Sequence, residues 1–342
     1  MRSIVITGAN GGIGCATVKL LVEHGCQVFG CVRNSAQAAR LADMFPHRFV
    51  PLIFDVRDEA AVTHAAEQVR CQLQGKTLDG LINNAATALP GPLLHQSLDE
   101  IRGQLETNLL GAVIVAKAFV PLLGVDHGLT GSPGKLINMS SICGKFGTPF
   151  ATAYCASKYG LEGFSESLRR ELKPYGITVI IVAPGQVKTS IWERAARQTA
   201  GRYDATPFAW PFRKGSSVLV KVARNHGLEP SRVAETIWHA LTSEHPRVRY
   251  APSRHPILEQ GLARLMPRRL MDHIIDRRLC LSERLAKTPT QYRKNTGFSY
   301  FFMGATAVSL RNWLTDTIGL NLSKSALRRG HASQPRGKRH YS

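Results

Sequence analysis

The sequence lacks the cysteine spacings of a metal site or a disulfide framework. Its seven cysteines form no C-x-x-C pair and are not accompanied by histidines at ligand spacing. Scattered cysteines of this kind argue against a zinc site and favour free thiols in a reducing compartment. We therefore predict no metal ligand and no disulfide-stabilised fold.

Long hydrophobic runs are also missing. The first apolar run, Ile4 to Ile6, is too short for a signal peptide, and no later run approaches the ~20 residues that span a bilayer. A cytosolic location is the expectation. No RNA- or DNA-binding motif accompanies the basic charge of the chain, so a nucleic-acid partner is not expected, although the charge alone would permit one.

Acidic residues are scarce in the second half of the chain. Residues 1–185 carry 16 Lys and Arg against 14 Asp and Glu, whereas residues 186–342 carry 28 against 10. The formal charge of +20 on 342 residues therefore belongs mostly to the C-terminal part. This length and a hydrophobic content of 44% suit one large α/β core, alone or with an appendage.

Strand and helix patterns alternate along the first 250 residues. Apolar and β-branched runs predict strands, and apolar residues at helical spacing predict helices. Strands are expected at 3–7, 27–32, 49–54, 136–139, 177–182 and 248–251, and helices at 16–23, 58–74, 98–122, 154–173 and 229–242. This alternation predicts an α/β fold with a doubly wound parallel sheet.

A glycine-rich turn, Gly8-Ala9-Asn10-Gly11-Gly12-Ile13-Gly14, joins the first strand to the first helix. Glycines allow the backbone to turn tightly and to come close to a pyrophosphate, whose charge then lies at the N-terminus of the new helix. Because a strand precedes this turn and a helix follows it, the turn predicts a dinucleotide site.

The end of the second strand bears on the choice of cofactor. An acidic side chain here would bond the ribose 2′-hydroxyl of NAD, but Val32 occupies this position and Arg33 follows it. A guanidinium suits a 2′-phosphate, so the sequence favours NADP(H). The alternative is that Arg33 is a solvated loop residue.

Tyr154 and Lys158 stand four residues apart at the end of the stretch S-S-I-C-G-K-F-G-T-P-F-A-T-A-Y-C-A-S-K. Positions i and i+4 share one face of a helix, so the ammonium of Lys158 is expected beside the phenol of Tyr154. A fixed cation lowers the pKa of a tyrosine from about 10, which would let Tyr154 exchange a proton with an alcohol or carbonyl. The hydroxyl of Ser141 would hold the same substrate oxygen. A Y-x-x-x-K pair alone is also common in ordinary helices.

Three asparagines are expected to be structural or close to the site. Asn83 and Asn84 follow a strand, where such pairs brace the backbone, with cofactor proximity as a consequence. Asn108 lies in the middle of the helix expected at 98–122. A buried amide needs a partner, so Asn108 either bonds a neighbouring carbonyl or orders a water that leads to Lys158.

Together these motifs resemble the short-chain dehydrogenase/reductase family, in its short single-domain branch. They are T-G-A-N-G-G-I-G at 7–14, N-N-A at 83–85, Asn108, the serine 13 places before Tyr154, Y-C-A-S-K at 154–158 and P-G-x-x-x-T at 184–189. The resemblance covers roughly residues 1–250 and implies a Rossmann-like domain. One departure is Ala86, where the family often has glycine.

The resemblance implies a role for each matching residue. Tyr154 would be the acid/base, Ser141 would orient the substrate oxygen, Lys158 would tune Tyr154 and bond the nicotinamide ribose, and Asn108 would maintain a water relay. The implied NADP(H)-binding residues are Gly8, Asn10, Gly12, Ile13, Gly14, Arg33, Asp55, Val56, Asn84, Tyr154, Lys158, Pro184, Gly185, Val187 and Thr189. Asp55 would meet the adenine and Thr189 the carboxamide. Relatives also imply a homodimer or homotetramer that uses the Asn108 and Tyr154 helices.

Residues 186–226 follow the P-G turn, where this family places its substrate lid. They include Ile191, Trp192, Tyr203, Phe208, Trp210 and Phe212. Such side chains favour an apolar alcohol or ketone, sterol-like, retinoid-like or long-chain, as substrate. The alternative is that they pack the lid onto the sheet, and the same choice applies to Pro149 and Phe150.

The predicted organisation has three parts. Residues 1–255 form the catalytic domain with its lid, and residues 256–285 form basic helices packed on the core. Residues 286–342 form a basic, partly disordered tail with ten Lys and Arg and one acid. The basic helices would alternatively lie on an anionic membrane surface. An NADP(H)-dependent oxidoreductase is predicted, and the alternative is a non-catalytic NADP-binding scaffold whose tail recruits a membrane or partner.

Overall fold

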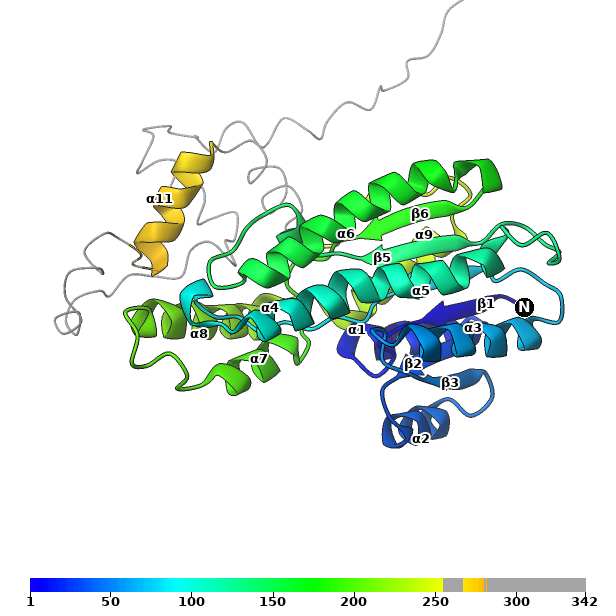
Figure 1. Cartoon of the computed structure of the whole chain (residues 1–342), viewed down its shortest axis with the longest axis horizontal. Coiled ribbons are helices and arrows are strands. Elements are labelled where there is room, and N and C mark those ends of the chain that lie inside the picture. Colours follow the sequence, from blue (N-terminus) through cyan, green and yellow to red (C-terminus); the bar gives the residue numbers. More distant parts are fainter. Residues whose placement is uncertain (255–266, 280, 282–342) are drawn as a thin grey trace, which may run out of the picture. The chain divides into compact units, whose positions relative to one another are not determined.

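The computed structural model describes residues 1–254, 267–279 and 281. The chain divides into two compact units, Met1–Tyr292 and Arg293–Ser342, and all described residues belong to the first. The predicted tail at 286–342 and most of the segment at 256–285 lie outside the described residues. Within 267–279 the chain forms a basic helix, α11 (Arg268–Leu279), none of whose residues is buried (Figure 1). Its docking onto the core stays a prediction.

A seven-stranded parallel sheet forms the centre of the domain, in the order β3-β2-β1-β4-β5-β6-β7 (Figure 1). The order reverses after β1, so that β4 pairs with β1 on the side opposite β2. The predicted doubly wound parallel sheet is thus confirmed. The strands are β1 (Ser3–Ile6), β2 (Gln27–Val32), β3 (Phe49–Ile53), β4 (Gly80–Asn83), β5 (Lys135–Met139), β6 (Thr178–Val182) and β7 (Arg249–Tyr250).

Helices cover both faces of this sheet. The apolar side chains of α3, α5 and α6 pack on one face, and those of α1, α2 and α9 pack on the other. Their bounds are α1 (Gly12–Glu23), α2 (Ser35–Met44), α3 (Glu59–Leu73), α5 (Gly111–Phe119), α6 (Thr152–Glu171) and α9 (Pro230–Thr242). Two further helices, α7 (Ile191–Thr199) and α8 (Ala209–His226), form the lid segment after β6.

The helix expected at 98–122 is helical throughout but not uniform. A capping box of Ser97 and Glu100 starts α4 (Leu98–Leu105), a π-helical stretch follows at Glu106–Leu110, and after α5 a 3-10 turn at Val120–Leu123 ends the run. π-helical insertions often occur at functional sites. By length and composition Leu98–Leu123 would suffice to cross a membrane. The expectation that no such stretch exists was therefore wrong, but here its apolar face packs against the sheet.

The sequence did not predict α2, whose mixed run S-A-Q-A-A-R-L-A-D-M has little apolar periodicity. The side chain of Asn34 starts this helix by accepting a hydrogen bond from the backbone N–H of Gln37. Buried Ala38 and Leu41 then hold it against the sheet. The helix fixes the backbone directly after Arg33, and the predicted preference for NADP(H) depends on this arginine.

Candidate active site

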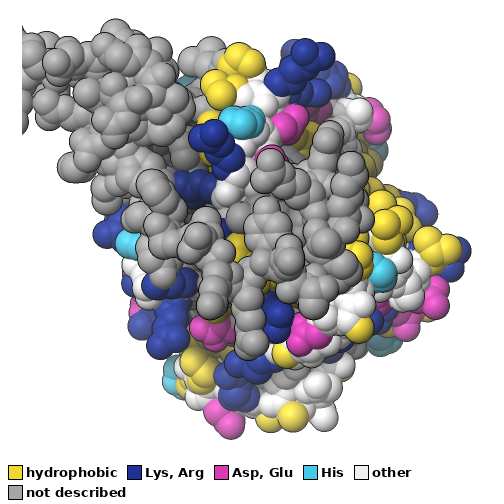
Figure 2. Space-filling view, turned by 90° about the vertical axis from the view of Figure 1, so that its left-hand side faces the viewer, with side chains coloured by type: hydrophobic (Ala, Val, Ile, Leu, Met, Phe, Trp, Pro, Cys, Tyr) yellow, Lys and Arg dark blue, Asp and Glu magenta, His cyan; other side chains and the backbone are white. Residues whose placement is uncertain are grey.

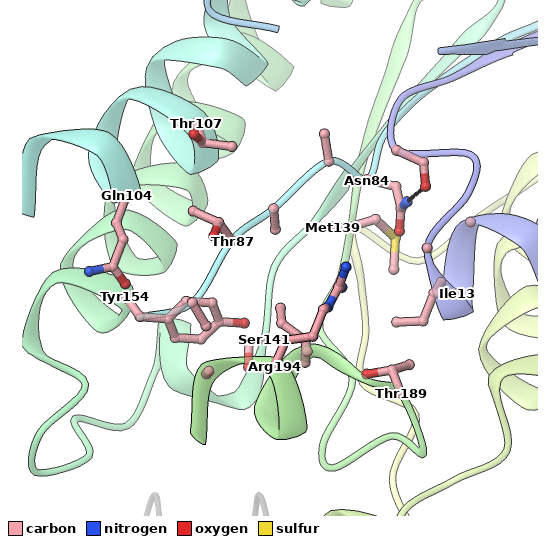
Figure 3. Close-up of a pocket in the computed structure, with 18 of the residues that line it drawn as sticks. Ile13, Asn84, Thr87, Gln104, Thr107, Met139, Ser141, Tyr154, Thr189 and Arg194 are labelled. Atoms are coloured by element: carbon pink, nitrogen blue, oxygen red, sulfur yellow. Dashed lines mark hydrogen bonds between the residues drawn. The ribbon is translucent and has the colours of Figure 1, made fainter. Parts of the chain in front are cut away.

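A cavity of about 560 Å³ lies at the carboxyl ends of the strands, between the glycine-rich turn and α7. Side chains reach it from α4, α6, α7 and the loops after β1, β2, β3, β4, β5 and β6. Figure 3 shows Ile13 and Asn84 on one side of this space and Tyr154 and Gln104 on the other. In a doubly wound sheet, ligands bind at this edge, near the point where the strand order reverses.

The glycine-rich turn has no room for larger residues. Gly8 has a φ of +66°, which favours glycine, and a Cβ on Gly14 would lie only 2.1 Å from the backbone oxygen of Gly8. A Cβ on Gly12 would lie 2.7 Å from Cγ2 of Thr189, so the turn also touches the segment that leads into α7. The turn is therefore tight, and its glycines line the cavity at the N-terminus of α1, as a pyrophosphate site requires.

The end of the cavity beside β2 is basic. Arg33 is exposed and lines the cavity, with only its backbone N–H bonded, to Gln37, among the described residues. Asp55 accepts two side-chain hydrogen bonds from Arg57, at 3.0 and 2.8 Å, and the pKa of Asp55 is lowered mainly by this contact. The sequence analysis had not considered Arg57. Asp55 neutralises it, which leaves Arg33 as the open cation at this end.

The paired asparagines brace the strand ends, as predicted. The amide of Asn84 donates to the backbone oxygens of Thr7 at 2.9 Å and Gly8 at 3.2 Å, which ties β4 to the glycine-rich turn. The amide of Asn83 donates to the side chain of Asn138 at 2.9 Å. These bonds hold the edge of the sheet where the cavity opens.

The loop that carries Ser141 is anchored from behind. The hydroxyl of the preceding residue, Ser140, donates to Glu162 of α6 at 2.9 Å. Glu162 is almost completely buried, and Arg249 of β7 donates to it at 3.0–3.2 Å while Lys145 lies 3.4 Å away. Ser141 itself accepts a hydrogen bond from the backbone N–H of Cys143. A buried ionic cluster therefore fixes the position of the serine.

Tyr154 lies in the first turn of α6 and is 8% exposed. Its hydroxyl and Ser141 line the same cavity, and its ring lies edge-on to Trp192, with centroids 5.5 Å apart (Figure 3). Burial raises the pKa of Tyr154, and the interaction with Ser141 offsets only part of this effect. The expectation of a lowered pKa was wrong for the protein alone, because desolvation of the phenolate, together with the nearby Cys143, raises it.

Lys158 lies below the tyrosine ring, one helical turn further along α6. Its ammonium donates to the backbone oxygen of Met139 at 2.8 Å and lies 5.9 Å from the ring centroid of Tyr154. Burial lowers the pKa of Lys158 to about 8. The predicted i, i+4 proximity is therefore present, but the ammonium is itself only weakly held in its charged form.

Asn108 lies in the π-helical stretch and does not line the cavity. Its amide oxygen accepts from the backbone N–H of Thr87 at 2.7 Å, and its nitrogen donates to the backbone oxygen of Thr87 at 2.9 Å and to Ser157 at 3.1 Å. Of the two alternatives, the bond to a neighbouring carbonyl is the one observed. The side chain holds the loop after β4 against α6, and the water relay stays a prediction.

All other predicted site residues line this one cavity. They are Gly8, Asn10, Gly12, Ile13, Gly14, Arg33, Asp55, Val56, Asn84, Ser141, Tyr154, Lys158, Pro184, Gly185, Val187 and Thr189. Sequence reasoning missed further lining residues, among them Thr87, Gln104, Thr107, Met139, Arg194 and Gln198. Their positions depend on how α4 and α7 pack, which no local motif specifies. The roles of all these residues stay predictions at this point.

The lid residues separate into two groups. Ile191 and Trp192 line the cavity. Tyr203 and Phe212 are buried against one another, with ring centroids 4.8 Å apart, and Phe150 contacts Phe212 at 5.6 Å. For Tyr203, Phe212 and Phe150, the sequence had left open substrate contact or packing, and the structure shows packing.

Comparisons with known proteins extend over most of the described chain. A family model described as short chain dehydrogenase matches residues 2–200. The NADPH-dependent 3-dehydrocapnine reductase of Ornithobacterium rhinotracheale is 32% identical over 274 residues, which cover 80% of this chain and 96% of that protein. Retinol dehydrogenase 5 of Mus musculus is 32% identical over 284 residues, which cover 80% of this chain and 87% of that protein.

A similar fold occurs among solved structures. The structure of actinorhodin polyketide ketoreductase with NADPH superimposes with a TM-score of 0.61 at 25% identity, and the match covers 74% of this chain and 96% of that chain. The similarity to these proteins therefore spans whole domains and is not confined to one motif.

Proposed function

The chain belongs to the short-chain dehydrogenase family, and from this membership we propose that it transfers a hydride between NADP(H) and the carbinol or carbonyl carbon of an apolar alcohol or ketone. Tyr154 is the acid/base of this reaction. The observation that carries the proposal is that Tyr154, Ser141 and Lys158 line the same cavity, with the ammonium of Lys158 5.9 Å from the ring centroid of Tyr154.

The cavity fits the proposed cofactor. The glycine-rich turn lines the cavity at the N-terminus of α1, where a diphosphate would bind, and a Cβ on Gly14 would clash with the backbone of Gly8 and disrupt the turn. Arg33 supplies an open guanidinium where a 2′-phosphate would lie, and Val32 leaves NAD without an acidic partner. The NADPH-dependent reductase from Ornithobacterium and the NADPH-bound ketoreductase support the same choice.

NADPH, when bound, supplies the hydride. Because burial keeps Tyr154 protonated at neutral pH, its phenol donates a proton to the carbonyl oxygen in the direction of reduction. The hydroxyl of Ser141 holds the same oxygen and fixes its distance from the phenol. Lys158 holds the nicotinamide ribose and supplies positive charge beside the phenolate that forms. Asn108 is a positioning residue, because it holds the loop that faces Tyr154.

The cavity walls near Tyr154 support an apolar substrate. Ile142, Ile191 and Trp192 line the cavity and pack against the cluster that contains Tyr154. Trp192 stands edge-on to Tyr154 and can cover one face of a flat or extended hydrocarbon beside the reacting carbon. Sterol-like, retinoid-like and long-chain carbonyl compounds fit this description, and the similarity to retinol dehydrogenase 5 supports the same class.

The test is turnover by the variant Tyr154→Phe, with a panel of apolar ketones and alcohols and with nicotinamide absorbance as the readout. We expect the variant to lose turnover while NADPH binding changes little, because the substitution removes one hydroxyl and keeps the ring. Unchanged turnover would end the catalytic assignment. It would then favour the alternative of a non-catalytic NADP-binding scaffold, whose output should depend on residues 286–342.

Location and assembly stay predictions. A cytosolic protein that touches an anionic membrane through its basic C-terminal part remains the proposal. A homodimer or homotetramer through α4, α5 and α6 remains a second one. Leu110 and Tyr159 are 51% and 46% exposed on these helices, which suits a contact face. Light scattering would measure the assembly directly.

A further inference from the structure

Arg194 places a positive charge inside the cavity from the lid helix α7. One face of this helix lines the cavity, through Ile191, Trp192, Arg194, Ala195 and Gln198. In Figure 3 the side chain of Arg194 extends from α7 into the cavity toward Met139 and Asn84. It is the one charged member of an otherwise neutral lid face.

No acidic side chain compensates this charge among the described residues. The three acidic residues that line the cavity already have partners, because Asp55 bonds Arg57, Glu100 bonds Arg202 and Asp99 bonds Arg102. The backbone N–H of Arg194 donates a hydrogen bond to the backbone oxygen of Ser190. Its guanidinium keeps all its donors for a ligand.

The charge of the lid segment has the same sign. Residues 186–226 contain eight Lys and Arg against two Asp and Glu. Basic side chains are spread over the described surface that Figure 2 displays, and α8 contributes Arg213, Lys214, Lys221 and Arg224 without an acidic residue. An excess of positive charge of this kind attracts anions to the lid segment.

We propose that Arg194 is an anion-binding residue of the lid, which binds an oxyanion of the occupied cavity. This oxyanion is either the diphosphate bridge of the dinucleotide or an acidic group that the substrate carries near its reacting carbon. A guanidinium binds phosphate, carboxylate and sulfonate oxygens through paired N–H donors. The inference rests on the proposed function, because it assigns the ligands of the same cavity.

Both sources of the oxyanion are within the reach of α7. Thr189, which precedes this helix, touches the phosphate-binding turn, since its Cγ2 lies 2.7 Å from the Cβ position of Gly12. On the same helix face Trp192 contacts the ring of Tyr154, where the reacting carbon would lie. Arg194 therefore stands between the turn and the catalytic tyrosine.

The chain supplies a matched control. Arg197 is on the same helix, is exposed like Arg194 and does not line the cavity. Arg194→Ala and Arg197→Ala therefore remove the same charge from α7, and only the first removes it from the cavity. Arg194→Lys keeps the charge but loses the planar pair of donors.

The first arm of the experiment measures NADPH binding by fluorescence titration in the full-length protein. If Arg194 binds the diphosphate, Arg194→Ala raises the NADPH Kd roughly 10- to 100-fold, the usual cost of a lost charge-assisted hydrogen bond. Arg194→Lys gives a smaller increase and Arg197→Ala leaves the Kd within about twofold.

The second arm measures the binding of dodecanoate and of 1-dodecanol to the NADPH-saturated protein by calorimetry. These probes have the same chain length and differ in charge. If Arg194 binds an acidic group of the substrate, the wild type prefers dodecanoate, and Arg194→Ala loses this preference while the NADPH Kd stays unchanged.

An effect in either arm supports the proposal and identifies the source of the oxyanion. The proposal is overturned if Arg194→Ala matches Arg197→Ala in both arms, including the case in which dodecanoate does not bind the wild type. Failure of the proposed function would give a different result, because the wild type would then bind no NADPH or would transfer no hydride to any member of the ketone panel.

Discussion

Tyr154 and Ser141 line the same cavity, and their contact opposes the rise in the pKa of the phenol, although the first lies in the first turn of α6 and the second follows β5. The contact depends on a second one behind it, in which Ser140 donates to Glu162 at 2.9 Å. Helix α6 therefore supplies both the tyrosine and the carboxylate that fixes the serine loop. One helix therefore sets the geometry of the two groups that we propose hold the substrate oxygen.

The pH dependence of catalysis should follow Lys158. Burial lowers the pKa of this base to about 8, so its charged fraction falls as the pH rises through that value. Tyr154 stays protonated over the same range, because burial raises its pKa. We expect kcat/KM for ketone reduction to be flat below pH 7 and to fall about tenfold per pH unit well above pH 8. A pH–rate profile from 6 to 10 measures this.

Lys158→Arg is the control for this assignment, since a guanidinium keeps its charge throughout the range. Its activity at neutral pH should be lower, because the guanidinium does not fit the site of an ammonium, but its profile should lack the inflection near 8. A wild-type profile that stays flat to pH 9, or an equal inflection in Lys158→Arg, would assign the pH dependence to another group.

The parts of the site that the sequence predicts are those that local geometry determines. The glycine-rich turn needs small residues wherever it forms, and an i, i+4 pair shares a face on any helix, so Gly14 and the Tyr154–Lys158 pair were predictable. The strand and helix alternation likewise gave the parallel sheet. Each of these depends on residues that are close together in the chain.

The remaining features depend on contacts between distant segments. Arg249 bonds Glu162 only because β7 lies beside β6 in the sheet, and no sequence motif predicts that pair. The pKa of Tyr154 is raised mainly by burial, which the spacing of Tyr154 and Lys158 in the sequence does not reveal. Arg194 reaches the cavity only because of how α7 packs. Tertiary packing therefore determines the pKa of Tyr154 and the partners of the charged side chains, which the spacing of residues in the sequence does not specify.

Cofactor preference should depend on Arg33. Arg33 lines the end of the cavity where we propose that the adenosine lies, while the neighbouring Arg57 is neutralised by Asp55. We expect Arg33→Ala to raise the NADPH Kd roughly 10- to 100-fold and to change NADH binding little, because only NADPH carries a 2′-phosphate. Fluorescence titration with both cofactors measures the two values.

Arg40→Ala is the matched control, since Arg40 is exposed on α2 and does not line the cavity. It removes the same charge from the same region and should leave both values within about twofold. Equal weakening of NADPH and NADH by Arg33→Ala would refute the 2′-phosphate assignment and leave Arg33 as a solvated loop residue.

Glu162 should stabilise the fold and the serine loop together. Its carboxylate is 2% exposed and accepts hydrogen bonds from Ser140 and Arg249. Glu162→Ala removes the anion from a partly buried arginine and leaves Ser140 without its partner, at a cost of ~3 kcal/mol in the free energy of unfolding. For a domain of this size such a loss lowers Tm by on the order of 10 °C. Differential scanning calorimetry measures the shift, and Glu166→Ala, at an exposed position of the same helix, is the control with little expected change.

Because the loop carries Ser141, Glu162→Gln, which keeps an acceptor for Ser140, should retain more turnover than Glu162→Ala at a temperature where both are folded. Equal turnover of these two variants would mean that the carboxylate stabilises the sheet edge without positioning the serine.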